Sequence, residues 1–285
     1  MKKNNKYKRG YAEMSNIELN KIYNEDCFIT MKNIHNEVDI VLTSPPYNTS
    51  KKRGTWKKGQ KTHYDIKEID TMTDEEYEEF TVNLFNSYNK VLKDNGVVLY
   101  NISYSNDKPY QIFSVINKIM QETNFVIADT IIWKKKSALP NNMSHNRLTR
   151  ICEFVFVFCR KNELKTFTMN KEILSVRPNG IKQYTSYYNF IEAKNNDGSC
   201  ELNKATYSSD LCTKLLDMYA QNNMVIYDSF MGTGTTAVSC IKKGLNYIGS
   251  ELSQAQCEYA INRVNGIIDK ECVNQNINKN KLTLT

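Results

Sequence analysis

The sequence predicts an α/β fold in which a mostly parallel, twisted sheet carries helices on both faces. Apolar runs of strand length alternate with segments of helical period along most of the 285 residues, which is the pattern of βα units. One apolar run, Ile40 to Leu42, ends abruptly at Pro45-Pro46. A second, Met224 to Tyr227, leads into a Gly-rich turn that opens a helix, as at the ligand-binding edge of open α/β sheets.

The elements are predicted from periodicity and from start and stop signals. In order they are strand 17–23, helix 24–34, strand 38–43, helix 73–93, strand 96–102, helix 110–121, strands 125–133 and 151–159, helix 209–221, strand 224–227, helix 236–243, strand 245–249 and helix 253–265. The helix at 73–93 has the strongest signals, because Thr73 and Glu76 form a capping box and Asn95-Gly96 is a stop signal. Its apolar face consists of Tyr77, Phe80, Leu84, Tyr88 and Val91.

Three segments do not follow this alternation. Residues 1–15 are polar and basic and are predicted to be a flexible leader, and 267–285 a flexible polar tail. Residues 49–70 form a long loop of basic and aromatic residues, which either contacts nucleic acid, closes over a substrate or is a solvated insertion. Residues 163–206 are irregular, and we interpret them as an insertion for target recognition that does not build the core.

The domain organisation follows from these segments. Residues 16–266 form one main domain, with a catalytic half at 16–162 and a cofactor-binding half at 207–266 on either side of the insertion. A length of 285 residues suits such a domain, and a hydrophobic content of 40% suffices for its core.

Composition excludes several classes of protein. The eight cysteines contain no C-x-x-C pair and the three histidines no metal-ligand spacing, so we expect buried thiols, a reducing cytoplasm and no metal. The basic start of the chain lacks the apolar core of a signal peptide, and no apolar run approaches the about 18–20 residues that span a bilayer. We therefore expect a cytoplasmic protein.

The net charge is +7, from 38 Lys and Arg against 31 Asp and Glu. Part of this excess is clustered, at Lys51-Lys52-Arg53 after the Pro-Pro turn and at Lys134-Lys135-Lys136 after a later strand. Clustered basic residues indicate a polyanionic partner.

The segment Ser44-Pro45-Pro46-Tyr47 offers a hydroxyl, a proline carbonyl and an aromatic plate just past the end of a strand. Two acceptors and a stacking surface suit a planar group that bears an exocyclic NH₂, such as a nucleobase. A Pro-Pro turn with a packing tyrosine is the structural alternative.

In the Gly-rich turn, Gly232 and Gly234 allow the backbone to approach a ligand closely. Glu251 ends the next predicted strand, where a carboxylate accepts hydrogen bonds from ribose hydroxyls. Its alternative role is to cap the following helix. No G-K-[ST] follows the glycines, so the turn is not a P-loop.

Together the two motifs resemble those of the amino-methyltransferases of DNA, in which D-x-F-x-G-x-G-T binds S-adenosylmethionine and [DNS]-P-P-[YFW] carries catalysis. Here they are Asp228 to Thr235 and Ser44 to Tyr47. Because the catalytic motif comes first, the order resembles the circularly permuted β subgroup. Asn24 to Cys27 resembles the family's G-D-C segment, and residues 129–161 resemble its W-x-K…R…E segment, with Trp133-Lys134, Asn146-Arg147 and Glu153.

The resemblance implies a Rossmann-like methyltransferase fold, S-adenosylmethionine as cofactor and double-stranded DNA as partner. The implied catalytic residues are Ser44, Pro45, Pro46 and Tyr47, and the implied cofactor-binding residues are Asp26, Asp228, Phe230, Gly232, Gly234, Thr235 and Glu251. The DNA-binding candidates are Lys51, Lys52, Arg53, Lys134, Lys135, Lys136 and Arg147. At 204–211 both prolines of the family's H-P-x-x-x-P motif are absent, which leaves contacts to the methionine end of the cofactor open.

The implied reaction is direct transfer of a methyl group to an amino nitrogen whose hydrogens are held by Ser44 and the Pro45 carbonyl, on a base flipped onto Tyr47. No Pro-Cys occurs, which argues against methylation of cytosine C5. A serine at the first motif position favours cytosine N4, because a hydroxyl both donates and accepts, and adenine N6 is the alternative.

The resemblance further implies a bacterial or phage modification enzyme of a restriction–modification system, a monomer or homodimer, whose cognate endonuclease acts separately. Three other hypotheses stay open. They are an inactive DNA-binding relative, an NAD-dependent dehydrogenase that uses the same Gly-rich turn, and a methyltransferase of RNA or protein.

Overall fold

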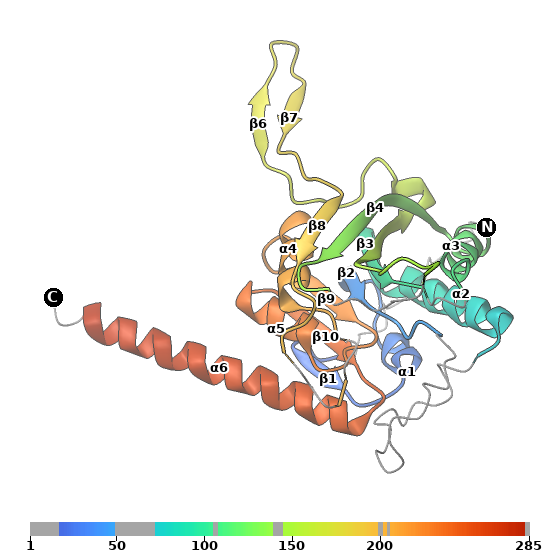
Figure 1. The fold of residues 1–285 in the computed structure, drawn as a ribbon. Helices are drawn as coiled ribbons and strands as arrows, with labels where there is room; N and C mark the ends of the chain where they lie inside the picture. Colours follow the sequence, from blue (N-terminus) through green and yellow to red (C-terminus); the bar gives the residue numbers. More distant parts are fainter. Residues whose placement is uncertain are drawn as a thin grey trace, which may run out of the picture.

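The computed structural model describes residues 17–48, 72–104, 108–138, 145–198, 202–203 and 206–282 (Figure 1). The predicted leader 1–15 and the predicted loop 49–70 lie outside these residues. The elements are β1 Lys21–Tyr23, α1 Cys27–Lys32, β2 Val38–Thr43, α2 Asp74–Val91, β3 Leu92–Ile102, α3 Gln111–Glu122, β4 Phe125–Lys135, β5 Cys152–Arg160, the 3₁₀ turn Lys161–Glu163, β6 Ile173–Val176, β7 Lys182–Tyr184, β8 Phe190–Ala193, α4 Ser209–Tyr219, β9 Val225–Asp228, α5 Thr235–Lys242, β10 Asn246–Ser250 and α6 Gln254–Leu282.

The main sheet has eight strands in the order β1-β10-β9-β2-β3-β5-β4-β8. All neighbouring strands are parallel except those that flank β5, which runs antiparallel to both β3 and β4. The first residues of β5 therefore lie at the same edge as the last residues of the parallel strands. This reversal brings a residue from the start of a strand to the edge where ligands bind in such sheets.

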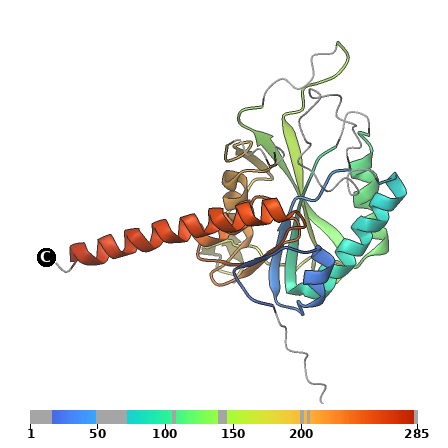
Figure 2. The same ribbon diagram turned by 90° about the horizontal axis from the view of Figure 1, so that it is seen from below.

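Alternating side chains along the strands supply two separate cores. On β2, Ile40 and Leu42 face the core that α4, α5 and α6 cover, whereas Val38 and Val41 face the core that α1, α2 and α3 cover. A strand buried on both faces must be apolar at successive positions, as the run Val97 to Tyr100 in β3 also is. Figure 2 shows the two helix layers on opposite sides of the sheet, so the predicted α/β class is confirmed.

Helix α2 begins as predicted. Thr73 Oγ1 accepts from the Glu76 amide at 3.1 Å, and the Glu76 carboxylate accepts from the Thr73 amide at 2.8 Å, which closes the capping box. Tyr77, Leu84, Tyr88 and Val91 of the predicted apolar face are buried. The local signals of this helix therefore agree with its packing.

The predicted end of this helix is wrong. Helix α2 ends at Val91 and β3 begins at once with Leu92, which is fully buried and pairs with Val38. Asn95-Gly96, predicted to stop the helix, lies inside β3, where Asn95 has a positive φ of 62°. A Cβ at Gly96 would lie 3.0 Å from the Asp39 carbonyl oxygen, so the glycine permits close approach of β2 at an irregularity in the register.

The structure of residues 163–206 differs in two ways from the predicted insertion: part of it builds the core, and its hairpin lies away from the carboxyl edge of the sheet. Its strand β8 pairs with β4 and buries Ile191 and Ala193, so this part does build the core. The hairpin of β6 and β7 projects from the side opposite α1 and the start of α6, which follow the carboxyl ends of β1 and β10 (Figure 1). Of the described residues in this stretch, those that follow β8 lie at the carboxyl edge of the sheet, as Ser44 does. The role of 163–206 in target recognition stays a prediction.

Helix α6 runs to Leu282, far beyond the predicted end at 265, and extends away from the sheet (Figure 1). The predicted flexible tail at 267–285 is therefore helical through Leu282. No Pro or Gly occurs after Gly266, so the backbone meets no residue that would end a helix. None of the helices in the described residues is both long and apolar enough to cross a membrane.

Candidate active site and cofactor site

The predicted catalytic segment Ser44 to Tyr47 leaves β2 at the carboxyl edge of the sheet and is held on both sides. Thr43, the last residue of β2, donates from Oγ1 to Asp228 Oδ1 of the neighbouring β9 at 2.8 Å. The buried Tyr77 of α2 donates from its hydroxyl to the Pro46 carbonyl at 2.7 Å. With two prolines that fix their own φ angles, this anchoring leaves the segment little freedom.

The Tyr47 hydroxyl lies at the centre of a polar cluster from three strands. It is 3.0 Å from Ser44 Oγ, 3.2 Å from Asn101 Oδ1 near the end of β3, and 3.2 Å from Glu153 Oε2 near the start of β5. Asn101 donates from Nδ2 to the Phe154 carbonyl at 3.1 Å, which points its Oδ1 at Tyr47. Sequence reasoning assigned no role to Asn101, and named Glu153 only as part of a motif.

The direction of these hydrogen bonds follows from counting protons. The Asn101 oxygen and an ionised Glu153 carboxylate accept only, so the one hydroxyl proton of Tyr47 is donated to one of them. The Ser44 hydroxyl must then donate to Tyr47. Ser44 Oγ is consequently left with lone pairs that can accept a hydrogen bond from a ligand.

Glu153 is also held by Lys135, whose ammonium group pairs with its other carboxylate oxygen. Lys135 Nζ lies 5.0 Å from the ring centroid of Trp133, in the range of a cation–π contact. Trp133 and Glu153 are register partners on β4 and β5. Lys135, predicted to bind DNA, is thus part of the Tyr47 cluster, where burial and the Glu153 charge raise the pKa of Tyr47 well above its usual value.

Asp228 organises the Gly-rich turn from inside the protein. Its fully buried carboxylate accepts from Thr43 Oγ1, from the Phe230 amide at 3.1 Å, from the Tyr207 hydroxyl at 3.0 Å and from Thr236 Oγ1. Burial raises the pKa of Asp228 even though these donors stabilise its charge. Tyr207 comes from the stretch 204–211 that departs from the family motif, so this stretch does reach the turn.

Both glycines of the turn adopt positive φ angles, 54° at Gly232 and 83° at Gly234. A Cβ at Gly234 would lie only 2.9 Å from Ala260 Cβ, so this glycine packs α5 against α6. The predicted cofactor residue Thr235 is buried and receives a hydrogen bond from Arg263 Nη1 at 3.2 Å. Thr235 therefore supports the turn from the side of α6.

Glu251 lies just after β10, beside the turn, and is buried. Its two carboxylate oxygens accept from the Gly232 amide and from the Ser253 amide, each at 2.8 Å. The contact with Ser253 holds the residue that precedes α6, and Ser253 Oγ itself accepts from the Gln256 amide at 3.5 Å. The contact with the Gly232 amide joins Glu251 to the turn. Burial raises the pKa of Glu251.

Asp26 and Phe230 complete the predicted cofactor residues. Asp26 caps α1, with Oδ1 accepting from the Phe28 amide at 2.7 Å, and lies beside the end of β10 because β1 and β10 are neighbours. Phe230 is half-buried, with its ring centroid 6.2 Å from that of Phe80 on α2.

The predicted DNA-binding residues that the structure describes have separate surroundings. Lys134 pairs with Glu192 at 3.0 Å and Lys136 lies 3.9 Å from Asp210, both at the carboxyl edge. Arg147 is exposed, and Lys51, Lys52 and Arg53 lie outside the described residues. Within the described part of the chain, no group of His, Cys, Asp and Glu residues has the arrangement of a metal site.

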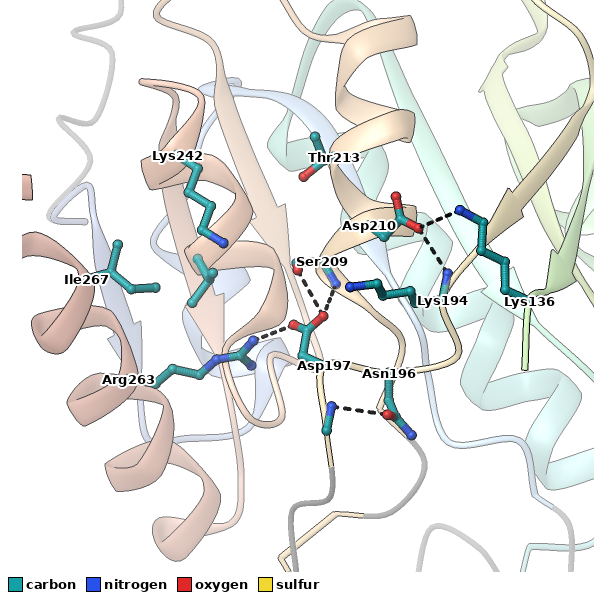
Figure 3. Close-up of a pocket in the computed structure, with 12 residues that line it drawn as sticks. Lys136, Lys194, Asn196, Asp197, Ser209, Asp210, Thr213, Lys242, Arg263 and Ile267 are labelled. Carbon is teal, nitrogen blue, oxygen red and sulfur yellow. Dashed lines mark hydrogen bonds and ion pairs between the residues drawn. The ribbon is translucent and has the colours of Figure 1, made fainter. Parts of the chain in front are cut away.

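A pocket of about 780 Å³ lies between α4, α5, α6 and the stretch after β8 (Figure 3), and neither Ser44 nor Glu251 lines it. Its charged groups are largely paired with each other: Asp197 accepts from Arg263 and from the Ser209 amide, and Asp210 pairs with Lys136. Of the predicted site residues that the structure describes, Lys136 lines this pocket. These contacts connect the stretch after β8 to α4 and α6 of the cofactor-binding half.

Residues 38–262 match the N6/N4 methyltransferase family model described as DNA methylase, which covers both motifs and the polar cluster. The chain belongs to this DNA methylase family. It is accordingly a DNA amino-methyltransferase of the N6/N4 type that uses S-adenosylmethionine. The predicted family and cofactor are confirmed.

Similar proteins agree with this assignment. The chain is 28% identical over 272 residues to the type II methyltransferase M.HinfI of Haemophilus influenzae, covering 90% of this chain and 71% of that one. It is 26% identical over 247 residues to the type II methyltransferase M2.MboI of Moraxella bovis, with 85% of each chain covered.

Among solved structures, the PvuII DNA methyltransferase, described as cytosine-N4-specific, is similar with a TM-score of 0.64 and 18% identity over 84% of each chain. The complex of M1.HpyAVI with S-adenosylmethionine has a TM-score of 0.55 and 20% identity, covering 86% of this chain and 98% of that one. These similarities show that this DNA methylase has the methyltransferase fold that the sequence predicted.

Proposed function

We propose that this enzyme methylates the N4 amino group of cytosine in a specific sequence of double-stranded DNA, as the modification enzyme of a restriction–modification system. The observation that carries the site assignment is the contact of the Ser44 hydroxyl with Tyr47, whose hydroxyl also faces two acceptors; from these acceptors we infer that Ser44 donates to Tyr47 and so presents lone pairs. An acceptor at this position suits the hydrogens of an exocyclic NH₂. The preference for cytosine rests on the serine itself and on the family resemblance.

Adenine N6 is the second candidate, and the same geometry favours it as much. With its proton committed to Tyr47, Ser44 does not donate to cytosine N3 unless the cluster rearranges. An acceptor alone serves either amino group equally well. Ser44 therefore favours cytosine less strongly in the folded protein than in the sequence.

S-adenosylmethionine supplies an electrophilic methyl group, and the residues around the Gly-rich turn fit this cofactor. The turn combines backbone at positive φ angles with the buried carboxylate of Glu251, which keeps lone pairs for ribose hydroxyls beyond those used by two amides. The half-buried Phe230 offers an apolar surface beside it. We assign Asp26, Gly232, Glu251 and Phe230 to cofactor binding, and Asp228 and Thr235 to support of the turn.

The protein's own contribution to the reaction is positioning. Ser44 and the Pro45 carbonyl hold the amino hydrogens, which favours a tetrahedral nitrogen whose lone pair is directed away from the ring. Tyr47 stacks on the flipped base. Because three strands hold its hydroxyl, the tyrosine is pre-oriented before DNA binds.

Nucleoside mass spectrometry of unmethylated DNA, incubated with the enzyme and S-adenosylmethionine, tests the proposal. We expect N4-methylcytosine; N6-methyladenine would refute the base assignment and leave the site assignment intact. Tyr47→Ala should abolish methylation with cofactor binding retained, whereas Gly232→Asp should abolish both, because it adds a negative charge and a Cβ beside Glu251. Cofactor binding measured by calorimetry separates the two effects, and methylation by either variant would contradict its assignment.

A further inference from the structure

We propose that Glu153 is a positioning residue that takes up, through the hydroxyls of Tyr47 and Ser44, the proton that the amino group loses on methylation. This inference rests on the proposed function, in which Ser44 accepts a hydrogen bond from that amino group. It concerns a residue on the reversed strand β5, outside the Ser-Pro-Pro-Tyr segment.

The three groups form a continuous chain of hydrogen bonds. Ser44 Oγ lies 3.0 Å from Tyr47 Oη, and Tyr47 Oη lies 3.2 Å from Glu153 Oε2. Each hydroxyl donates in the direction of the carboxylate, as the proton count requires. The chain is therefore aligned to move positive charge away from Ser44 before any substrate arrives.

Among the described residues that contact the Tyr47 hydroxyl, Glu153 supplies the group that can take up a proton. Asn101 Oδ1 lies equally close to Tyr47, at 3.2 Å, but a neutral amide oxygen does not take a proton near neutral pH. Lys135 holds the other oxygen of Glu153, which leaves Oε2 directed at Tyr47. The Glu153 side chain is 14% exposed, so it can return the proton to solvent after the product leaves.

The step balances as follows. As the lone pair of the amino nitrogen forms the new bond to the methyl carbon, the bond between that carbon and the sulfonium sulfur breaks and its electron pair stays on sulfur. An N–H bond of the amino group then breaks in the same step, and its proton passes to Ser44 Oγ. Ser44 passes its own proton to Tyr47, and Tyr47 passes its own proton to Glu153 Oε2. These transfers are concerted, because burial raises the pKa of Tyr47 and makes a separate tyrosinate costly. Neither hydroxyl is changed at the end.

Glu153→Gln tests the inference, since it keeps the size of the side chain and removes its basicity. We expect the single-turnover rate of methyl transfer to fall by about 10²-fold or more, the range of general-base effects. The KM for DNA and the affinity for S-adenosylmethionine, measured by calorimetry, should change less than about threefold. Glu153→Asp should recover part of the rate, and the acidic limb of the pH–rate profile should be present with Asp and absent with Gln.

Two further variants test whether the residues act together. Tyr47→Phe keeps the ring and breaks the chain, so the double variant with Glu153→Gln should be no slower than the slower single variant. Glu122→Gln is the matched control, because it removes a carboxylate from a Lys–Glu pair, with Lys118, on the far helix α3. It should leave the rate unchanged.

The inference is overturned if Glu153→Gln keeps the wild-type rate and pH profile, if Glu153→Asp is no faster than Glu153→Gln, or if the two losses multiply in the double variant. Loss of cofactor affinity in parallel with the rate would also overturn it, because the effect would then be structural. Absence of methylation by the wild-type enzyme on any DNA would instead refute the proposed function.

Discussion

Replacing Gly234 by alanine should destabilise the protein through one identifiable contact. Gly234 has a φ of 83°, and a Cβ there would lie 2.9 Å from Ala260 Cβ and 3.2 Å from Ala260 Cα on α6. A left-handed conformation costs a residue with a Cβ about 1–2 kcal/mol. Crowding against a helix that is itself packed adds about 1–3 kcal/mol. The expected loss of unfolding free energy is therefore about 2–5 kcal/mol.

Gly244→Ala is the matched control. Gly244 has a φ of 65°, and a Cβ there would meet nothing within 4 Å, so only the backbone term of about 1–2 kcal/mol applies. Urea unfolding followed by circular dichroism gives both values, provided the m-values agree. In an Ala260→Gly background, where the nearest atom is gone, the cost of Gly234→Ala should fall by about 1 kcal/mol or more.

Equal losses in the Gly234 and Gly244 variants would refute this reasoning, because crowding against α6 would then contribute nothing. A cost that is unchanged in the Ala260→Gly background would refute it as well. If the reasoning holds, Gly234→Ala should also weaken binding of S-adenosylmethionine, since relief of the crowding must shift the turn that carries Gly232.

Other expected outcomes follow from single sites. The raised pKa of Asp228 means that the native state holds the proton of this carboxyl more tightly than the unfolded state does. Its contribution to stability is therefore present below about pH 4 and is lost as pH rises through the native pKa. Asp228→Asn should remove that fall from unfolding free energies measured at a series of pH values, and an identical pH dependence in the variant would contradict the shift. Thr73→Ala should cost about 1 kcal/mol by loss of the capping box, whereas the exposed mid-helix change Asn86→Ala should not destabilise in the same urea assay. Charge reversal at Lys134 and Lys136 should weaken DNA binding and lower its slope against log salt by about one for each phosphate that the protein no longer neutralises; an unchanged slope would exclude both lysines from the DNA interface.

Much of the fold was predictable because its signals are local. The capping box at Thr73 and Glu76 involves residues three apart, and the buried strand at 38–43 contains the apolar run Ile40 to Leu42. The two motifs were expected at the ends of strands, where the structure has them. The errors at Asn95-Gly96 and in β8 arise because strand pairing overrides what a short window of sequence indicates. The error in α6 has another cause: the polar composition after residue 266 indicated a flexible tail, although no Pro or Gly there ends the helix.

The candidate site divides in the same way. From the sequence alone come Ser44 to Tyr47, the glycines and Glu251, because turn chemistry and spacing along one βα unit place them. Only the tertiary structure brings Asn101 and Glu153 to Tyr47, across 54 and 106 residues of chain.

That meeting depends on the reversal of β5, which sets the start of one strand beside the ends of its neighbours. The same reversal places Lys135 of β4 beside Glu153 of β5, where the two side chains form an ion pair. In the sequence, the run of three lysines indicated only a polyanionic partner. The sequence determines which groups stand at the ends of helices and strands. The order and direction of the strands decide which of those ends meet, because hydrogen-bonded pairing of strands depends on segments that are far apart in the chain.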